Sequence, residues 1–152
     1  MKYPIAPLAV LSLIAIGALY SALDAQPAPS QTTRSVWEGV YSDEQAKRGQ
    51  ALYNKECAKC HGDELSGGES APPLAGAEFL SNWNGLTVGD LFERTRISMP
   101  QDKPGKLGRQ QNSDILAYMF TFNRFPAGKA ELPQQAEVLK QIRIEFEKSK
   151  DK

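Results

Sequence analysis

The stretch that decides the fold reads Cys57-Ala58-Lys59-Cys60-His61. Its two thiols stand three positions apart, and an imidazole follows the second thiol directly. A structural zinc site needs about four Cys or His ligands, whereas this chain has 2 cysteines and 1 histidine in all. A thioredoxin-like dithiol needs a βαβ setting, and the flanking sequence has no such pattern. The number of possible ligands therefore argues against a zinc site, and the flanking sequence argues against a redox-active dithiol.

A Cys-x-x-Cys-His run is the attachment signature of haem c. Two thiols at this spacing reach the two vinyl groups of one porphyrin, so Cys57 and Cys60 are the predicted thioether positions. The next residue is then placed beneath the iron, which makes His61 the predicted proximal ligand. The sequence thus predicts one covalently bound haem c as the cofactor.

Composition narrows the choice of the second residue that binds the haem iron. His61 is the only histidine, so a second histidine from this chain is excluded, and 3 methionines remain as thioether candidates. Met1 lies at the start of the chain, and Met119 lies on the apolar stripe of a predicted helix, where core packing explains it. Met99 ends a predicted helix immediately before Pro100. We predict that Met99 is the axial ligand; an ordinary loop-anchoring role is the alternative.

Three helices are predicted from apolar spacing and helix-start residues. They span about residues 43–55, 88–97 and 109–123, and the apolar stripe of the last helix is Ile115, Met119 and Phe122. Ser42 and Thr87 are typical N-cap residues ahead of the first two. A shorter helical turn is expected at 79–84, and Gly- and Pro-rich loops are expected at 62–76 and 101–108. With no strand signal of useful length, the predicted class is all-α, with about four to five helices around the haem.

The N-terminus predicts export from the cytoplasm. Lys2 precedes an uncharged, largely apolar stretch from Tyr3 to Leu23, and Asp24 ends it. This pattern is typical of a secretory signal, with cleavage after Ala25 or Ala22. An uncleaved membrane anchor is the alternative, because roughly 20 apolar residues span a bilayer. In either case a periplasmic location is expected, with membrane contact only if the segment is retained.

Three segments follow the predicted signal peptide at 1–25. Residues 26–41 are rich in Pro, Ser and Thr and are predicted to form a linker or arm. Residues 42–128 form the helical domain, and 129–152 are a C-terminal extension whose apolar residues are able to pack on it. The chain has 18 basic and 18 acidic residues, so it lacks the basic surplus of a nucleic-acid-binding protein.

The order of helix, CxxCH, proline loop, methionine loop and last helix resembles the class I monohaem cytochromes c of the bacterial periplasm. The resemblance covers roughly residues 42–126 and implies the cytochrome c fold. In that family a glycine and an aromatic residue precede the CxxCH on its helix, and Gly49 and Tyr53 match them. An aromatic residue of the last helix packs across this glycine, which Tyr118 matches.

The resemblance also implies a set of residues around the haem. A family proline offers its backbone carbonyl to the proximal histidine, and Pro72 is similar in position. Trp83 corresponds to a family tryptophan near a haem propionate. Mitochondrial relatives carry a ring of lysines around the haem edge, and this neutral chain has no surplus with which to build one.

These features predict an electron-transfer protein rather than an enzyme. A His/Met-ligated haem has no open position for a substrate, whereas a peroxidase or gas sensor needs one. The expected partners are a redox donor and a redox acceptor, a dehydrogenase or an oxidase. The alternative is a cytochrome subunit of a larger periplasmic dehydrogenase, for example of the quinoprotein type. Size exclusion of the native protein separates these two interpretations.

Overall fold

Helices carry almost all of the regular structure in the computed structural model, which describes residues 34–69 and 71–148. In chain order the elements are β1 (Arg34–Ser35), the short 3₁₀ helix η1 (Val36–Glu38), α1 (Asp43–Glu56), α2 (Ala58–His61), α3 (Gly76–Trp83), α4 (Val88–Ser98), α5 (Arg109–Phe122), α6 (Ala136–Leu139) and β2 (Ile142–Arg143). The predicted all-α class is confirmed. The predicted signal at 1–25 lies outside the described residues, and no described helix is both long and apolar enough to cross a membrane.

The helix starts follow the predicted capping chemistry. The Ser42 hydroxyl accepts a hydrogen bond from the backbone N–H of Gln45 at 3.2 Å, which begins α1. The Thr87 hydroxyl accepts from the N–H of Asp90 at 3.1 Å, and the Asp90 carboxylate accepts from the Thr87 N–H at 3.0 Å. This reciprocal pair is a capping box, and it begins α4. Both N-cap predictions are therefore confirmed.

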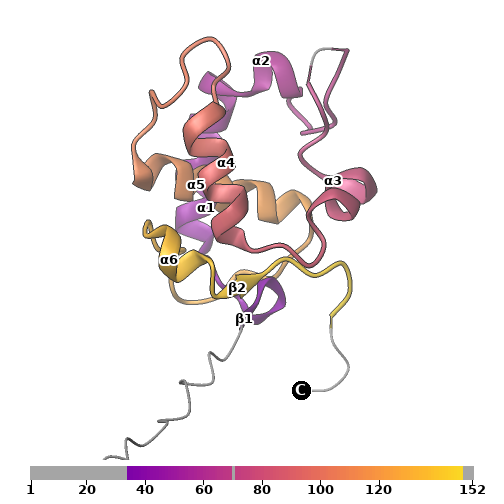
Figure 1. Cartoon of the computed structure of the whole chain (residues 1–152), viewed down its shortest axis with the longest axis vertical. Coiled ribbons are helices and arrows are strands. Elements are labelled where there is room, and N and C mark those ends of the chain that lie inside the picture. The colour runs from indigo at the N-terminus through magenta and orange to yellow at the C-terminus, as the bar shows by residue number, and fades with distance from the viewer. Residues whose placement is uncertain (1–33, 70, 149–152) are drawn as a thin grey trace, which may run out of the picture. The chain divides into compact units, whose positions relative to one another are not determined.

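Helices α1 and α5 cross in the middle of the described unit (Figure 1). A Cβ placed on Gly49 would lie 1.8 Å from the carbonyl oxygen of Asp114 and 3.0 Å from Tyr118 Cβ. Only a glycine permits this approach, and the prediction that Tyr118 packs across it is confirmed. The Arg48 guanidinium donates to both carboxylate oxygens of Asp114 at 3.1 Å. This bidentate pair joins the two helices beside the crossing.

The apolar face of α5 differs in one respect from the predicted stripe. Ile115 and Met119 are buried as expected, but Phe122 is 38% exposed. Leu116 and Phe120, which lie outside the predicted stripe, are fully buried. The helix is covered on more than one side, so a single stripe at helical spacing understates the buried face. The burial of Met119 agrees with its interpretation as a core residue.

Residues 34–41, before α1, and residues 127–148, after α5, belong to the same folded unit as the helices. Strand β1 pairs in parallel with β2, which the sequence did not indicate. The amide of buried Gln45 bonds both backbone groups of Leu132, donating at 3.1 Å and accepting at 2.7 Å. Helix α6 and the two strands lie at the opposite end of the unit from α2 (Figure 1). The tail thus braces the helices at a distance from the CxxCH run.

Shortening a buried side chain in the C-terminal segment, residues 129–148, is expected to destabilise the whole domain. Leu139 is 0% exposed, whereas its neighbour Val138 is 44% exposed. Leu139→Ala is expected to lower the free energy of unfolding by about 2–4 kcal/mol, because it leaves a cavity in the core. Val138→Ala, the matched control, is expected to change it by less than about 0.5 kcal/mol. Urea unfolding followed by circular dichroism measures both; equal effects would mean that the tail does not contribute to the core.

Candidate haem-binding site

One helical turn presents both thiols and the imidazole. The N–H of Cys57 donates to the carbonyl of Tyr53 at 2.8 Å, and the carbonyl of Cys57 accepts from the N–H groups of Cys60 at 3.1 Å and His61 at 3.0 Å. Residues three and four apart on a helix share a face. Cys57 is partly buried and Cys60 is exposed, and no disulfide joins them. The local fold therefore gathers the three predicted haem-binding side chains on one side of the turn.

His61 is held in a defined orientation. His61 is 8% exposed, and its Nδ1 lies 2.9 Å from the carbonyl oxygen of Pro72. A carbonyl can only accept, so Nδ1 carries the proton in this contact and Nε2 keeps the lone pair that binds a metal. This is the contact that the resemblance implied. A backbone partner of this kind orients a ligating histidine and raises its basicity.

Side chains and backbone of neighbouring segments hold the proline loop in place. The N–H of Gly67 donates to the carbonyl of His61 at 2.9 Å. The Asn123 side chain, at the end of α5, accepts from the N–H of Gly76 and donates to the carbonyl of Leu74, both at 3.1 Å. Sequence reasoning missed Asn123; the available signal was an asparagine at a helix end, where its side chain bonds nearby backbone.

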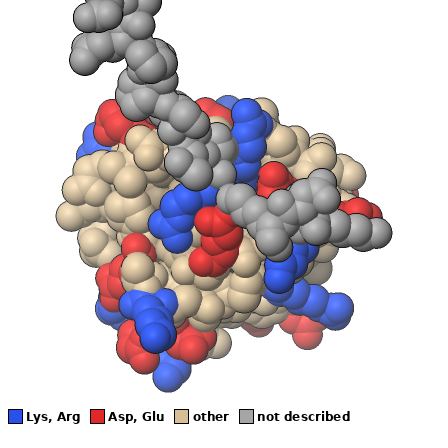
Figure 2. Space-filling model, turned by 90° about the horizontal axis from the view of Figure 1, so that it is seen from below, with Lys and Arg blue, Asp and Glu red and all other residues tan. Residues whose placement is uncertain are grey.

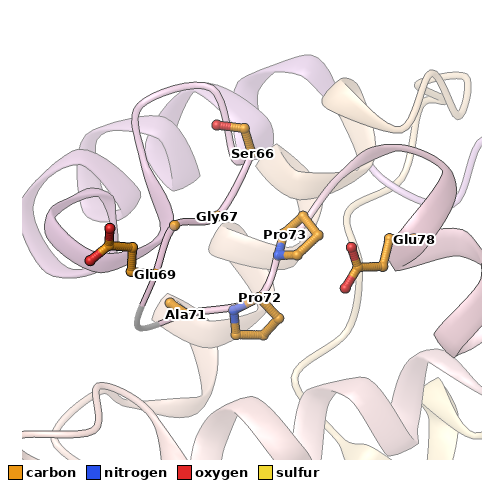
Figure 3. A pocket seen from close by; sticks show the side chains of 8 residues that line it. Ser66, Gly67, Glu69, Ala71, Pro72, Pro73 and Glu78 are labelled. Carbon is orange, nitrogen blue, oxygen red and sulfur yellow. The ribbon is translucent and has the colours of Figure 1, made fainter.

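A shallow hollow of about 550 Å³ lies on the proline loop. Its lining residues are Ser66, Gly67, Gly68, Glu69, Ala71, Pro72, Pro73 and Glu78. Glu69 and Glu78 lie on opposite sides of the two prolines (Figure 3). No Lys or Arg occurs in the sequence between Lys59 and Arg94. The proline loop therefore presents negative charge, unlike the face in Figure 2, where both signs are interspersed.

Tyr53 connects α1 to the turn that follows the imidazole. Its ring is 0% exposed, and its hydroxyl donates to the carbonyl of Gly62 at 2.7 Å. Burial raises the pKa of Tyr53 well above the usual tyrosine value. The ring also contacts Tyr118, with centroids 5.4 Å apart. Tyr53 thus fixes the backbone directly after His61.

This burial predicts a loss of stability at alkaline pH. A tyrosine ionises near pH 10 in the unfolded chain, whereas the folded Tyr53 stays protonated, so the stabilisation present below about pH 10 declines as pH rises further. Tyr53→Phe is expected to lower the free energy of unfolding by about 1 kcal/mol at neutral pH and to flatten the alkaline decline. Urea unfolding at several pH values from 7 to about 11 measures both effects.

Tyr118→Phe is the control for this prediction. Its hydroxyl has no hydrogen-bond partner within residues 34–69 and 71–148, so a change below about 0.5 kcal/mol is expected at neutral pH. An alkaline decline as steep in Tyr53→Phe as in the parent protein would contradict the assignment to Tyr53.

Met99 ends α4 and starts the loop to α5. Its N–H donates to the carbonyl of Thr95 at 2.9 Å, and its side chain is partly exposed. The loop and α2 lie at the same end of the unit (Figure 1). The structure thus places Met99 on the loop that the sequence indicated.

Trp83 was also predicted to lie near the haem. It is partly buried, and the centroid of its ring lies 6.3 Å from that of Phe79.

An ion pair joins the loop after Met99 to the end of α1, the haem-attachment helix, which leads directly into the CxxCH run. Lys106 Nζ lies 2.6 Å from Glu56 Oε2, and Glu56 directly precedes Cys57. The hydrogen bond from Lys106 holds the pKa of Glu56 below its usual range, although partial burial opposes it. At the end of the loop, buried Asn112 donates to the carbonyl of Leu107 at 3.1 Å. Sequence reasoning missed this pair, because nothing in the spacing of positions 56 and 106 indicates that they meet.

The residues at this end of the fold fit a covalently held haem. Several apolar side chains pack on the core yet remain partly exposed, as expected where a flat apolar ring covers them. They are Leu52, Cys57, Ala58, Leu74, Ala75, Leu80 and Trp83. Within the described part of the chain, no three His, Cys, Asp or Glu side chains converge as a metal site. The candidate donors are instead the His61 imidazole and the two thiols of the CxxCH run, with the Met99 thioether as the predicted further donor.

A helical domain that carries Cys-x-x-Cys-His at the end of its first long helix, with the imidazole held by a proline carbonyl, is a c-type cytochrome. The family model described as cytochrome c oxidase, cbb3-type, subunit III matches residues 44–119, half of the chain, and the chain belongs to this family. It therefore carries haem c and transfers electrons with redox protein partners.

One solved structure is similar to the chain. The crystal structure of the sulfane dehydrogenase SoxCD from Paracoccus pantotrophus has 20% sequence identity, with 82% of this chain and 68% of that chain covered and a TM-score of 0.47. No curated protein matches the chain.

Proposed function

We propose that this protein is a periplasmic electron carrier without enzymatic activity, which uses one haem c ligated by His61 and Met99. The observation that carries the proposal is the 2.9 Å contact between His61 Nδ1 and the Pro72 carbonyl, which leaves Nε2 as the metal-binding nitrogen. The chain has one Cys-x-x-Cys-His run and one histidine, which supports a single haem.

Met99 is the proposed second axial ligand. It is the methionine that begins the loop at the same end of the fold as α2, whereas Met119 is 2% exposed in the core. When bound, haem c supplies a one-electron Fe(II)/Fe(III) couple. If His61 and Met99 both bind the iron, it would keep no open position for a substrate. The protein's own part is to orient the imidazole through Pro72 and to hold the methionine loop.

The periplasmic assignment rests on the N-terminal sequence. Lys2 and the uncharged stretch from Tyr3 to Leu23 support export, and two thiols in an exported chain are available for covalent haem attachment. N-terminal sequencing of the mature protein tests it: a start at Gln26 or Leu23 supports cleavage after Ala25 or Ala22. An intact Met1 supports a retained anchor.

The second candidate is a permanent cytochrome subunit of a larger complex. The name of the family favours it, because that family is described as an oxidase subunit. The haem chemistry is the same in both cases, and only the lifetime of the partner contact differs. A partner approaching the proline loop would meet the carboxylates Glu69 and Glu78. Size exclusion of the native protein separates the candidates, since a stoichiometric partner that co-elutes supports the subunit and a monomer supports the free carrier.

The ligand assignment is tested by optical spectroscopy of the native protein. A weak charge-transfer band at the red edge of the oxidised spectrum reports an iron–thioether bond. Its presence in a low-spin spectrum supports His61 and Met99 as the ligand pair. A high-spin oxidised spectrum, or a low-spin spectrum without the band, overturns Met99 as the ligand.

A further inference from the structure

The loop that carries Met99 has few attachments of its own. Residues 101–106 are all exposed, and the contacts between Pro100, Lys103 and Lys106 are backbone turns within the loop. Among the described residues, the Lys106–Glu56 ion pair is the one side-chain bond that joins positions 99–106 to another element. The position of most of this loop therefore depends on that one pair.

The geometry of the Lys106–Glu56 ion pair indicates that it helps to hold the loop in position. The Nζ–Oε2 distance is 2.6 Å, and the Glu56 side chain is 10% exposed while that of Lys106 is 43% exposed. Lys55 lies near the same carboxylate, but at 3.8 Å. A carboxylate that is only 10% exposed and makes a short contact is screened less by salt than a fully exposed pair. Glu56 is also the last residue of α1, so it moves with Cys57 and the haem-attachment turn.

We propose that the Lys106–Glu56 ion pair latches the methionine loop to the haem-attachment helix and thereby sets how readily an external ligand displaces Met99 from the iron. The proposal rests on the His61/Met99 ligation proposed above. The two side chains act through loop position and, within the described residues, form no hydrogen bond to His61 or Met99, so they are positioning residues. Loss of the latch leaves Met99 attached to α4 but frees the six residues from 101 to 106 to move together.

The test is imidazole binding to the oxidised holoprotein. Imidazole competes with the thioether, so its affinity reports how easily the loop opens. In Glu56→Gln and in Lys106→Gln, imidazole is expected to bind about three- to fivefold more tightly than in the parent protein. The double variant is expected to match either single variant, because the same bond is already lost. The charge-swapped pair Glu56→Lys with Lys106→Glu is expected to restore most of the parent affinity.

Glu93→Gln is the matched control. Glu93 forms an ion pair of 2.7 Å with Arg96, but both residues lie on α4, so this pair joins no loop to another element. Its removal is expected to leave imidazole affinity unchanged within about twofold. Raising the salt concentration is expected to weaken the latch in the parent protein and to have little effect on imidazole affinity in Glu56→Gln.

Hydrogen exchange of the loop amides gives a readout that does not depend on the iron. Exchange at the hydrogen-bonded amides of Lys103 and Lys106 is expected to accelerate in Glu56→Gln and Lys106→Gln but not in Glu93→Gln. Unchanged exchange and imidazole affinity in both latch variants, with the iron–thioether band present, would overturn the latch alone. Absence of the band in the parent protein overturns the ligation proposal and the latch with it.

Discussion

Met99→Ala is expected to lower the reduction potential by on the order of 0.1–0.3 V and to abolish the red-edge band of the oxidised protein. Axial-ligand identity moves haem potentials over a range of about 0.8 V, and a methionine ligand raises the potential relative to weaker or harder ligands. The side chain lies at the end of α4 and is partly exposed, so its removal leaves the core intact. Spectroelectrochemical titration of parent and variant measures both effects.

Met119→Leu is the control for this variant. Met119 is 2% exposed on α5, and leucine keeps nearly the same volume, so a stability change below about 1.5 kcal/mol is expected. The band and the potential are expected to stay as in the parent protein. If Met99→Ala leaves the spectrum unchanged, or if Met119→Leu removes the band, then another group binds the iron.

Local patterns predicted the helices because their causes are local. Ser42 and Thr87 each satisfy a backbone N–H group three residues further on, so a cap is readable from a few letters. The CxxCH run is equally local, since one helical turn contains both thiols and the imidazole. The crossing at Gly49 was readable only through the family resemblance, because it depends on where another helix lies.

The parts that sequence reasoning missed depend on contacts between distant positions. The parallel pairing of β1 with β2 joins Arg34 to Ile142, and each strand is only two residues long. So short a strand carries no period-2 signal. The Lys106–Glu56 pair is missed for the same reason, since either charge alone is typical of a solvated surface. Tertiary position, rather than residue type, gives these residues their roles.

Gly49→Ala is expected to destabilise the protein by about 2 kcal/mol or more. The added Cβ would lie 1.8 Å from the carbonyl oxygen and 2.5 Å from the carbonyl carbon of Asp114. Both are backbone atoms of α5, so no side chain is free to turn aside and the two helices must separate. Overpacking of this kind costs about 1–3 kcal/mol and sometimes more, while the better helix propensity of alanine returns only about 1 kcal/mol. Urea unfolding of the haem-loaded protein measures the difference.

Gly108→Ala separates this clash from a general effect of replacing glycine. A Cβ on Gly108 would meet only Gln111 Oε1, at an ordinary contact distance of 3.5 Å, and φ there is −67°. Because Gly108 is an N-cap, a loss below about 1 kcal/mol is expected. The crossing also aligns Tyr53 with Tyr118, so Gly49→Ala is expected to disturb the turn after His61 and to broaden the red-edge band. A Gly49→Ala protein as stable as Gly108→Ala would mean that α1 and α5 do not pack this closely in solution.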